Sequence, residues 1–149
     1  MAVSHWSYII LMFIAGMAVP VMAGMNAGFG LKLQSPMGAV AVLCFAAFCF
    51  ALAVLVFSQK PNWAGAAEIP KAFYLGGGLF VFYIASITLA APRIGLGNAI
   101  FLVLLGQIVS AVLIDHFGLF GMTETKVSVS RVGGIVLMVA GIYLARRGA

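Results

Sequence analysis

Gln107 and Ser110 are the residues whose types and spacing could do chemistry in this otherwise apolar chain. They lie three residues apart in an apolar segment at 96–114, so a helix would present both on one face. Gln107 falls near the middle of the segment, and its amide offers two donors and an acceptor. It could bind a polar solute, or it could join helices through a hydrogen bond worth about 0.6 kcal/mol on average. We expect the binding role, because Gly106 leaves space beside it.

Two other polar residues inside apolar segments are candidates for the same site. Tyr83 falls near the middle of segment 70–90, and its buried hydroxyl would need a partner, for which Gln107 is suitable. Asn26 comes at the end of the first segment, where it would either cap a helix or face the mouth of a cavity. Pro20 removes a helical hydrogen bond nearby, so we expect a kink that marks either a binding site or a packing contact.

The remaining candidates lie near segment ends. Asn98 lies nine residues before Gln107, on the opposite face of the helix and nearer its end. Asp115 and Arg93 could gate opposite mouths of a cavity, although each could equally be an ordinary interfacial charge. No Asp, Glu, Lys, Arg or His lies in the middle of any segment, so the sequence shows no deep carboxylate for trapping cations. We therefore expect a substrate-binding set of Gln107, Ser110, Tyr83, Asn26, Asn98, Asp115 and Arg93.

Helices that span a membrane must position these residues. The chain has 149 residues, of which 64% are hydrophobic and 7% are charged, whereas a soluble domain has about 25% charged residues. We predict an all-α polytopic membrane protein with one domain over residues 1–149. Each span needs about 20 apolar residues, and the expected spans lie near 7–25, 36–57, 70–90, 96–114 and 127–146. Residues 1–7 hold no Lys or Arg, which argues against a cleaved signal peptide.

The basic residues are divided equally between the two sides of such a membrane protein. One side would hold Lys60, Lys71, Lys126 and Arg131, and the other would hold Lys32, Arg93, Arg146 and Arg147. An excess of Lys and Arg normally marks the cytoplasmic side. Without an excess, either early charges or a different assignment of spans sets the orientation, or the chain inserts both ways round.

Several functions find no support in these residues. Cys44 and Cys49 lie in one apolar segment, and His5 and His116 lie near span ends, so no cluster has metal-ligand spacing. No nucleophile and base are paired, so we expect neither an enzyme nor a bound cofactor. The basic residues form no single patch, which argues against nucleic-acid binding.

The second half of the chain resembles the YdcZ-type family of small bacterial inner-membrane proteins. The similar residues are APRIG at 91–95, GQ at 106–107, Ser110 and IDHFGLFG at 114–121, and Asn26, Ser35-Pro36 and Gly76-Gly77-Gly78 fit earlier segments. Met22 departs from the pattern, since many relatives have a glutamine there. The family belongs to the drug/metabolite transporter superfamily, and its five-helix members are about half of the usual ten-helix transporter.

The resemblance and the balanced charges together suggest an antiparallel homodimer. Ten-helix members resemble two inverted five-helix repeats, and such transporters bind substrate where the repeats meet. A five-helix chain could reproduce this arrangement with an inverted copy of itself. We therefore expect a multi-pass transporter in the bacterial inner membrane that moves a small polar or amphipathic metabolite by alternating access. The alternative is a non-transporting assembly or modulator subunit, in which the same polar residues only join helices.

Overall fold

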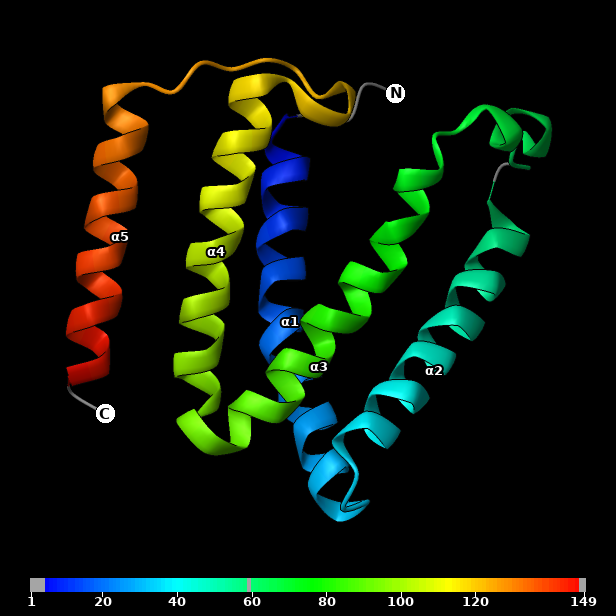
Figure 1. Ribbon diagram of the computed structural model, residues 1–149, viewed down its shortest axis with the longest axis horizontal. Coiled ribbons are helices and arrows are strands. Elements are labelled where there is room, and N and C mark those ends of the chain that lie inside the picture. Colours follow the sequence, from blue (N-terminus) through cyan, green and yellow to red (C-terminus); the bar gives the residue numbers. More distant parts are fainter. Residues whose placement is uncertain (1–4, 59, 148–149) are drawn as a thin grey trace. The chain divides into compact units, whose positions relative to one another are not determined.

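The computed structural model of the chain describes residues 5–58 and 60–147, and the described part is helical (Figure 1). The long helices are α1 (His5–Lys32), α2 (Pro36–Phe57), α3 (Gly76–Ile94), α4 (Leu96–Phe117) and α5 (Val129–Arg147). Short 3₁₀ helices cover η1 (Trp63–Glu68), η2 (Lys71–Leu75) and η3 (Leu119–Gly121). The predicted all-α class with five long helices is therefore confirmed.

Within the described residues, four segments are long and apolar enough to cross a membrane: His5–Lys32, Pro36–Phe57, Lys71–Ile94 and Leu96–Phe117. The apolar part of α5, Val129–Ala145, is shorter. The reason is in its first turn, where Ser130 and Arg131 replace apolar residues. The structure thus supports a multi-pass membrane protein with four long spans and a shorter fifth helix.

The first helix is longer than predicted, and this changes the position of Asn26. We expected the span to end near residue 25, but α1 continues to Lys32. The expectation that Asn26 caps the helix is wrong, because Asn26 lies inside α1 and is buried. Gly28 and Gly30, which resemble turn residues that would follow a span ending near residue 25, are helical.

A Schellman turn ends α1 instead. The N–H of Ser35 donates to the carbonyl of Gly30 at 3.1 Å, and the N–H of Gln34 donates to Leu31 at 3.2 Å. Gln34 has a φ of 52°, the left-handed conformation that glycine usually supplies at this position. Ser35 then caps α2 by accepting from the N–H of Gly38 at 3.1 Å. This three-residue connection makes α1 and α2 neighbours.

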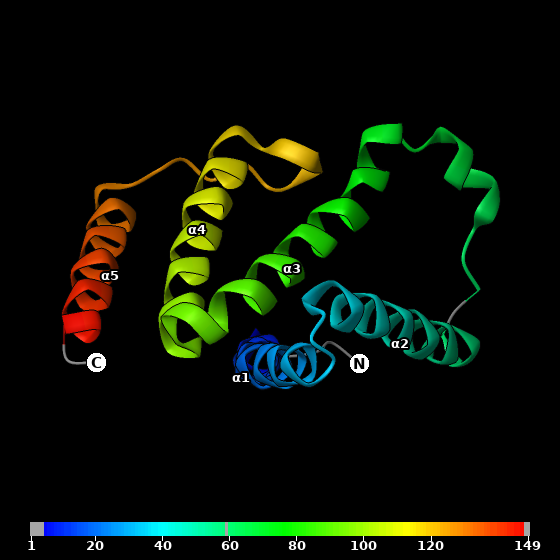
Figure 2. The same ribbon diagram turned by 60° about the horizontal axis from the view of Figure 1, so that its bottom comes forward.

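Contacts among α-carbons divide the chain into two compact units, Met1–Leu96 and Gly97–Ala149. The prediction of one domain over residues 1–149 stays a prediction, and each unit is described by itself. In the first unit, α1 packs against both α2 and α3, and α2 also contacts α3. Figure 2 shows α2 and α3 separating toward the ends that residues 58–75 connect.

The core of the first unit is small and consists mainly of small residues. Its buried residues follow helical spacing in α1 (Ala23, Asn26, Ala27, Gly30) and in α3 (Ile84, Ile87, Thr88, Ala91), with Ala39 and Val40 from the start of α2. A Cβ atom at Gly30 would lie 3.3 Å from the Cα of Pro36, which shows how closely the helices approach. The first half of α1 and most of α2 remain exposed apolar surface.

The third helix begins later and ends later than the predicted span 70–90. Pro70 does not start the α-helix but precedes η2, and the α-helical part begins at Gly76. The helix includes Pro92 and ends at Ile94, and the next residue, Gly95, has a φ of 85°. Gly95 is the only residue between α3 and α4.

In the second unit, an ordered loop joins α4 to α5. The carbonyl of Asp115 accepts the N–H of Thr125 at 2.8 Å, and Nδ1 of His116 accepts the N–H of Val127 at 3.3 Å. Ser128 then caps α5 by accepting the N–H of Arg131 at 3.2 Å. The loop therefore folds back on the end of α4.

Candidate functional site

A buried hydrogen bond between Asn26 and Thr88 joins α1 to α3. Nδ2 of Asn26 donates to Oγ1 of Thr88 at 2.7 Å, and this hydroxyl donates to the carbonyl of Ile84 at 2.8 Å. Asn26 is 5% exposed and Thr88 is 3% exposed. Two polar side chains are thus held away from solvent in spanning helices, where each needs its partner.

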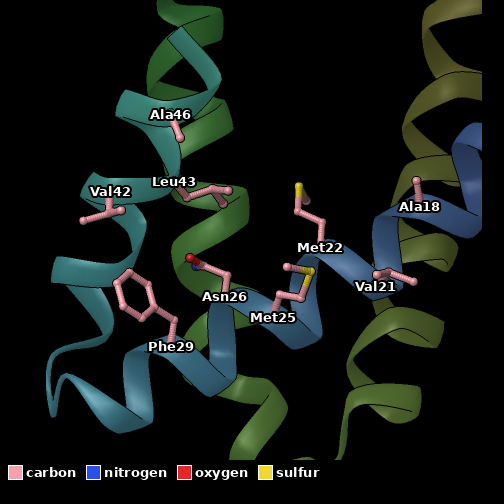
Figure 3. Close-up of a pocket in the computed structure, with 9 residues that line it drawn as sticks. All are labelled: Ala18, Val21, Met22, Met25, Asn26, Phe29, Val42, Leu43 and Ala46. Atoms are coloured by element: carbon pink, nitrogen blue, oxygen red, sulfur yellow. The ribbon is translucent and has the colours of Figure 1, made fainter. Parts of the chain in front are cut away.

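The amide of Asn26 also faces a pocket between α1 and α2 (Figure 3). The pocket has a volume of about 510 Å³, and Asn26 is the one polar residue among those lining it: Ala18, Val21, Met22, Met25, Asn26, Phe29, Val42, Leu43 and Ala46. Figure 3 shows Asn26 among the residues of α1 and α2 that line the pocket. One N–H of Nδ2 is engaged with Thr88, and the carbonyl oxygen is the atom of this amide that can accept a hydrogen bond from a ligand.

Pro20 lies between Ala18 and Val21, two residues of α1 that line this pocket. It is inside α1, and Figure 3 shows the helix changing direction between Ala18 and Met25. The predicted kink is therefore present, and the pocket lies beside it. The same bend brings Met22 into the pocket wall, at the position where the sequence departs from the family pattern.

A second cavity lies on the Thr88 side of the hydrogen bond. Its volume is about 240 Å³, and Thr88 and Arg93 line it together with Ala27, Gly30, Leu31, Pro36, Leu89 and Pro92. Arg93 is exposed, as an interfacial charge would be. Asn26 thus lines a larger apolar pocket, and its partner Thr88 lines a smaller cavity that has Arg93 in its wall.

The residues predicted in α4 have a different environment. Gln107 and Ser110 are exposed in the structure, and Asn98 is half-buried in the first turn of the helix. The predicted pair of Tyr83 with Gln107 would join the two units, and it stays a prediction. Tyr83 itself is half-buried in α3. Within the first unit the structure therefore brings together Asn26 and Arg93 around Thr88.

Asp115 is paired at the end of α4. Its Oδ2 accepts from Nη1 of Arg131 at 3.3 Å, and the two side chains are 38% and 39% exposed, respectively. Both line a cavity of about 500 Å³ between α4 and α5. The two residues are 16 positions apart in the sequence, so their pairing could not be predicted from spacing within one helix.

Thr88 is the residue that sequence reasoning missed. A threonine in a helix can bond its own backbone four residues earlier, so its hydroxyl gave no reason to expect a partner. Ser86 behaves in that way, donating to the carbonyl of Phe82 at 2.7 Å. One feature of the sequence could have identified Thr88. The helical spacing of Ile84, Ile87, Thr88 and Ala91 predicts one packed face that includes the Thr88 hydroxyl.

Comparison with known proteins gives one family. A family model described as "Putative inner membrane exporter, YdcZ" matches residues 7–144. No curated protein and no solved structure matches the chain. The match covers α2, α3 and α4 completely and most of α1 and α5, and it includes the Asn26–Thr88 pair and the Asp115–Arg131 pair. The chain belongs to the YdcZ family of inner-membrane, exporter-like proteins.

Proposed function

We propose that the protein is a secondary transporter that moves a small amphipathic metabolite across the bacterial inner membrane. The observation that carries the proposal is the pocket containing Asn26: one amide in an otherwise apolar wall, formed beside a proline kink in a spanning helix. Ligand sites are mostly apolar cavities with a few polar groups that fix orientation. Membership of an exporter-like family supports the same class of function.

The chemistry of the pocket favours the amphipathic end of the expected substrate range. Eight apolar residues would contact the body of a solute, and the carbonyl of Asn26 would accept one hydrogen bond from its hydroxyl or amine. The wall contains no acid or base, so a strongly charged solute would lose hydration without gaining a counter-ion. Met22 increases this apolar character.

We further propose that the transporter is an antiparallel homodimer that works by alternating access. Gln107 and Ser110 are exposed on one face of a spanning helix, and polar groups at that depth require a partner. An inverted second copy would supply one and would complete a ten-helix arrangement with a central chamber. In this dimer Gln107, Ser110 and Tyr83 line the chamber, Asn98 lies near the end of α4 on its other face, and Arg93 lies at a mouth.

Transport by the purified protein tests the proposal. Proteoliposomes are loaded with a defined mixture of amino acids, amines, sugars and organic acids, and the released solutes are identified by mass spectrometry. We expect wild-type protein to release at least one amphipathic solute faster than empty liposomes do. Asn26→Leu and Ala46→Phe, which remove the acceptor and fill the pocket, should abolish that release.

Ser86→Ala is the matched control, because the Ser86 hydroxyl bonds only its own helix at 2.7 Å. It should release the solute at the wild-type rate. Thermal melts of all variants identify any that fail to fold. If no solute leaves through wild-type protein, or if Ala46→Phe transports normally while folded, the transporter proposal fails and the non-transporting subunit replaces it.

Topology is tested separately with single cysteines at Lys60 and Arg147 in a chain lacking Cys44 and Cys49. These positions would lie on opposite sides of the membrane. Mixed orientation predicts that an impermeant maleimide labels part of each population in intact cells. Labelling confined to one of the two positions would refute the antiparallel dimer and leave the pocket proposal standing.

A further inference from the structure

The cavity between α4 and α5 has an unusual wall. Its residues recur with helical spacing on both helices: Ile108, Ala111, Val112 and Asp115 from α4, and Arg131, Gly134, Ile135 and Met138 from α5. They form two facing stripes with the ion pair at one end, and we call this cavity the α4–α5 seam. The seam is thus apolar along its length and charged only where the two helices approach the connecting loop.

Side chains do not fill the seam. Helices in close contact have axes about 8–10 Å apart, but α4 and α5 are not among the described helix pairs whose α-carbons approach within 8 Å. The seam holds about 500 Å³, and a Cβ atom at Gly134 would meet nothing within 4 Å. In a bilayer an open apolar groove of this kind must be filled by acyl chains or by another helix.

The ion pair of Asp115 and Arg131 indicates what kind of molecule would occupy the seam. Asp115 contacts Arg131 through one oxygen and one nitrogen, and both side chains are more than one third exposed. Among the described residues, no other side chain is bonded to either charge. The second carboxylate oxygen can therefore accept from an ammonium group, and the remaining guanidinium N–H groups can donate to a phosphate.

We propose that the α4–α5 seam is a binding site for a phospholipid with a primary ammonium headgroup, such as phosphatidylethanolamine. The phosphate lies against Arg131, the ammonium lies against Asp115, and one acyl chain lies along Ile108, Val112 and Ile135. Phosphatidylglycerol offers a phosphate but no cation for Asp115. Phosphatidylcholine offers a cation with no N–H to donate. The site is independent of the transport proposal, because it uses only the second unit.

Native mass spectrometry of the purified protein with each of the three lipids tests this site. We expect phosphatidylethanolamine to bind about tenfold more tightly than the other two, the ratio that one charge-assisted hydrogen bond gives. Asp115→Asn and Arg131→Gln should each remove this preference. Arg93→Gln, which alters an exposed arginine of the first unit, should leave it unchanged.

Two neighbouring glycines give a pair of variants that leave the charges intact. Gly134 lines the seam and Gly133 does not, and both have open space around an added Cβ. Gly134→Leu should lower phosphatidylethanolamine binding, whereas Gly133→Leu should not. Equal retention of the three lipids, a preference for phosphatidylglycerol, or equal effects of the two glycine variants would overturn the proposal. Loss of dimers in Gly134→Leu with lipid preference unchanged would assign the seam to a second copy instead.

Discussion

The hydrogen bond between Asn26 and Thr88 should contribute measurably to stability, and Thr88→Val isolates it. Valine keeps the shape of the side chain but removes the acceptor for Nδ2 of Asn26, 2.7 Å away. Both residues are at most 5% exposed, so water cannot replace the lost partner. An unsatisfied buried donor costs about 1–3 kcal/mol, whereas side-chain hydrogen bonds between membrane helices average about 0.6 and reach about 1.7 kcal/mol.

We expect a loss of about 1–2 kcal/mol in the free energy of unfolding for Thr88→Val, at the upper end of the membrane range because the bond is short and dry. Unfolding by sodium dodecyl sulfate in mixed micelles, followed by circular dichroism, measures this loss. Thr88→Ser keeps the hydroxyl and should recover most of it. Ser86→Ala should cost about 0.5 kcal/mol or less, because its hydroxyl only bonds Phe82.

A double-mutant cycle with Asn26→Leu separates the bond from the packing around it. We expect a coupling energy of about 1 kcal/mol between the two positions. A coupling energy of zero, with Thr88→Val no worse than Ser86→Ala, would show that the two side chains do not interact in the folded protein. The interpretation of Asn26 as a positioned acceptor in its pocket would then lose its basis.

Three further substitutions test the packing of the first unit, each by the same unfolding measurement. Gly30→Ala should cost about 1–3 kcal/mol, because the added Cβ would meet the Pro36 backbone at 3.3 Å and Thr88 at 3.4 Å. Gly28→Ala should be neutral or slightly stabilising, since nothing lies within 4 Å and alanine favours helix; similar losses at both glycines would contradict the packing described. Gln34→Gly should stabilise the protein by up to about 1 kcal/mol by relieving the left-handed conformation of Gln34, and a loss of stability would show that the Gln34 side chain makes a contact of its own.

The apolar segments could be predicted from the sequence because lipid imposes one simple requirement on them. A span needs a long apolar run, and the bounds of α2 and the start of α4 agree with the prediction. The predicted end of the first span, near residue 25, was wrong because Gly28 and Gly30 resemble turn residues. In the structure Gly30 is helical and allows close packing against Pro36, and the left-handed Gln34 ends the helix instead. A backbone conformation that glycine usually adopts is hard to predict from a glutamine.

In the candidate site, too, some residues could be predicted from the sequence, whereas others depend on how the helices pack. Asn26 could be identified because an amide in a spanning helix needs a partner. Thr88 could not, because a hydroxyl that satisfies itself four residues back can still accept a second bond, and only the approach of α1 decides whether it does. Asp115 was identified by its charge, but its relation to Arg131 depends on how the α4–α5 loop folds back.

The two polar pairs have a common feature that bears on the role of the few polar residues in this apolar chain. Asn26 pairs with Thr88 where the helices of the first unit pack, and one oxygen of its amide remains toward a pocket. Asp115 pairs with Arg131 where α4 and α5 separate, and both charges remain partly exposed beside a groove. In each case the partner within the chain reduces the cost of placing a polar group near lipid, while part of its bonding capacity stays available. That combination distinguishes a ligand-binding group from a purely structural one, and it is the reason to test these pairs before Gln107.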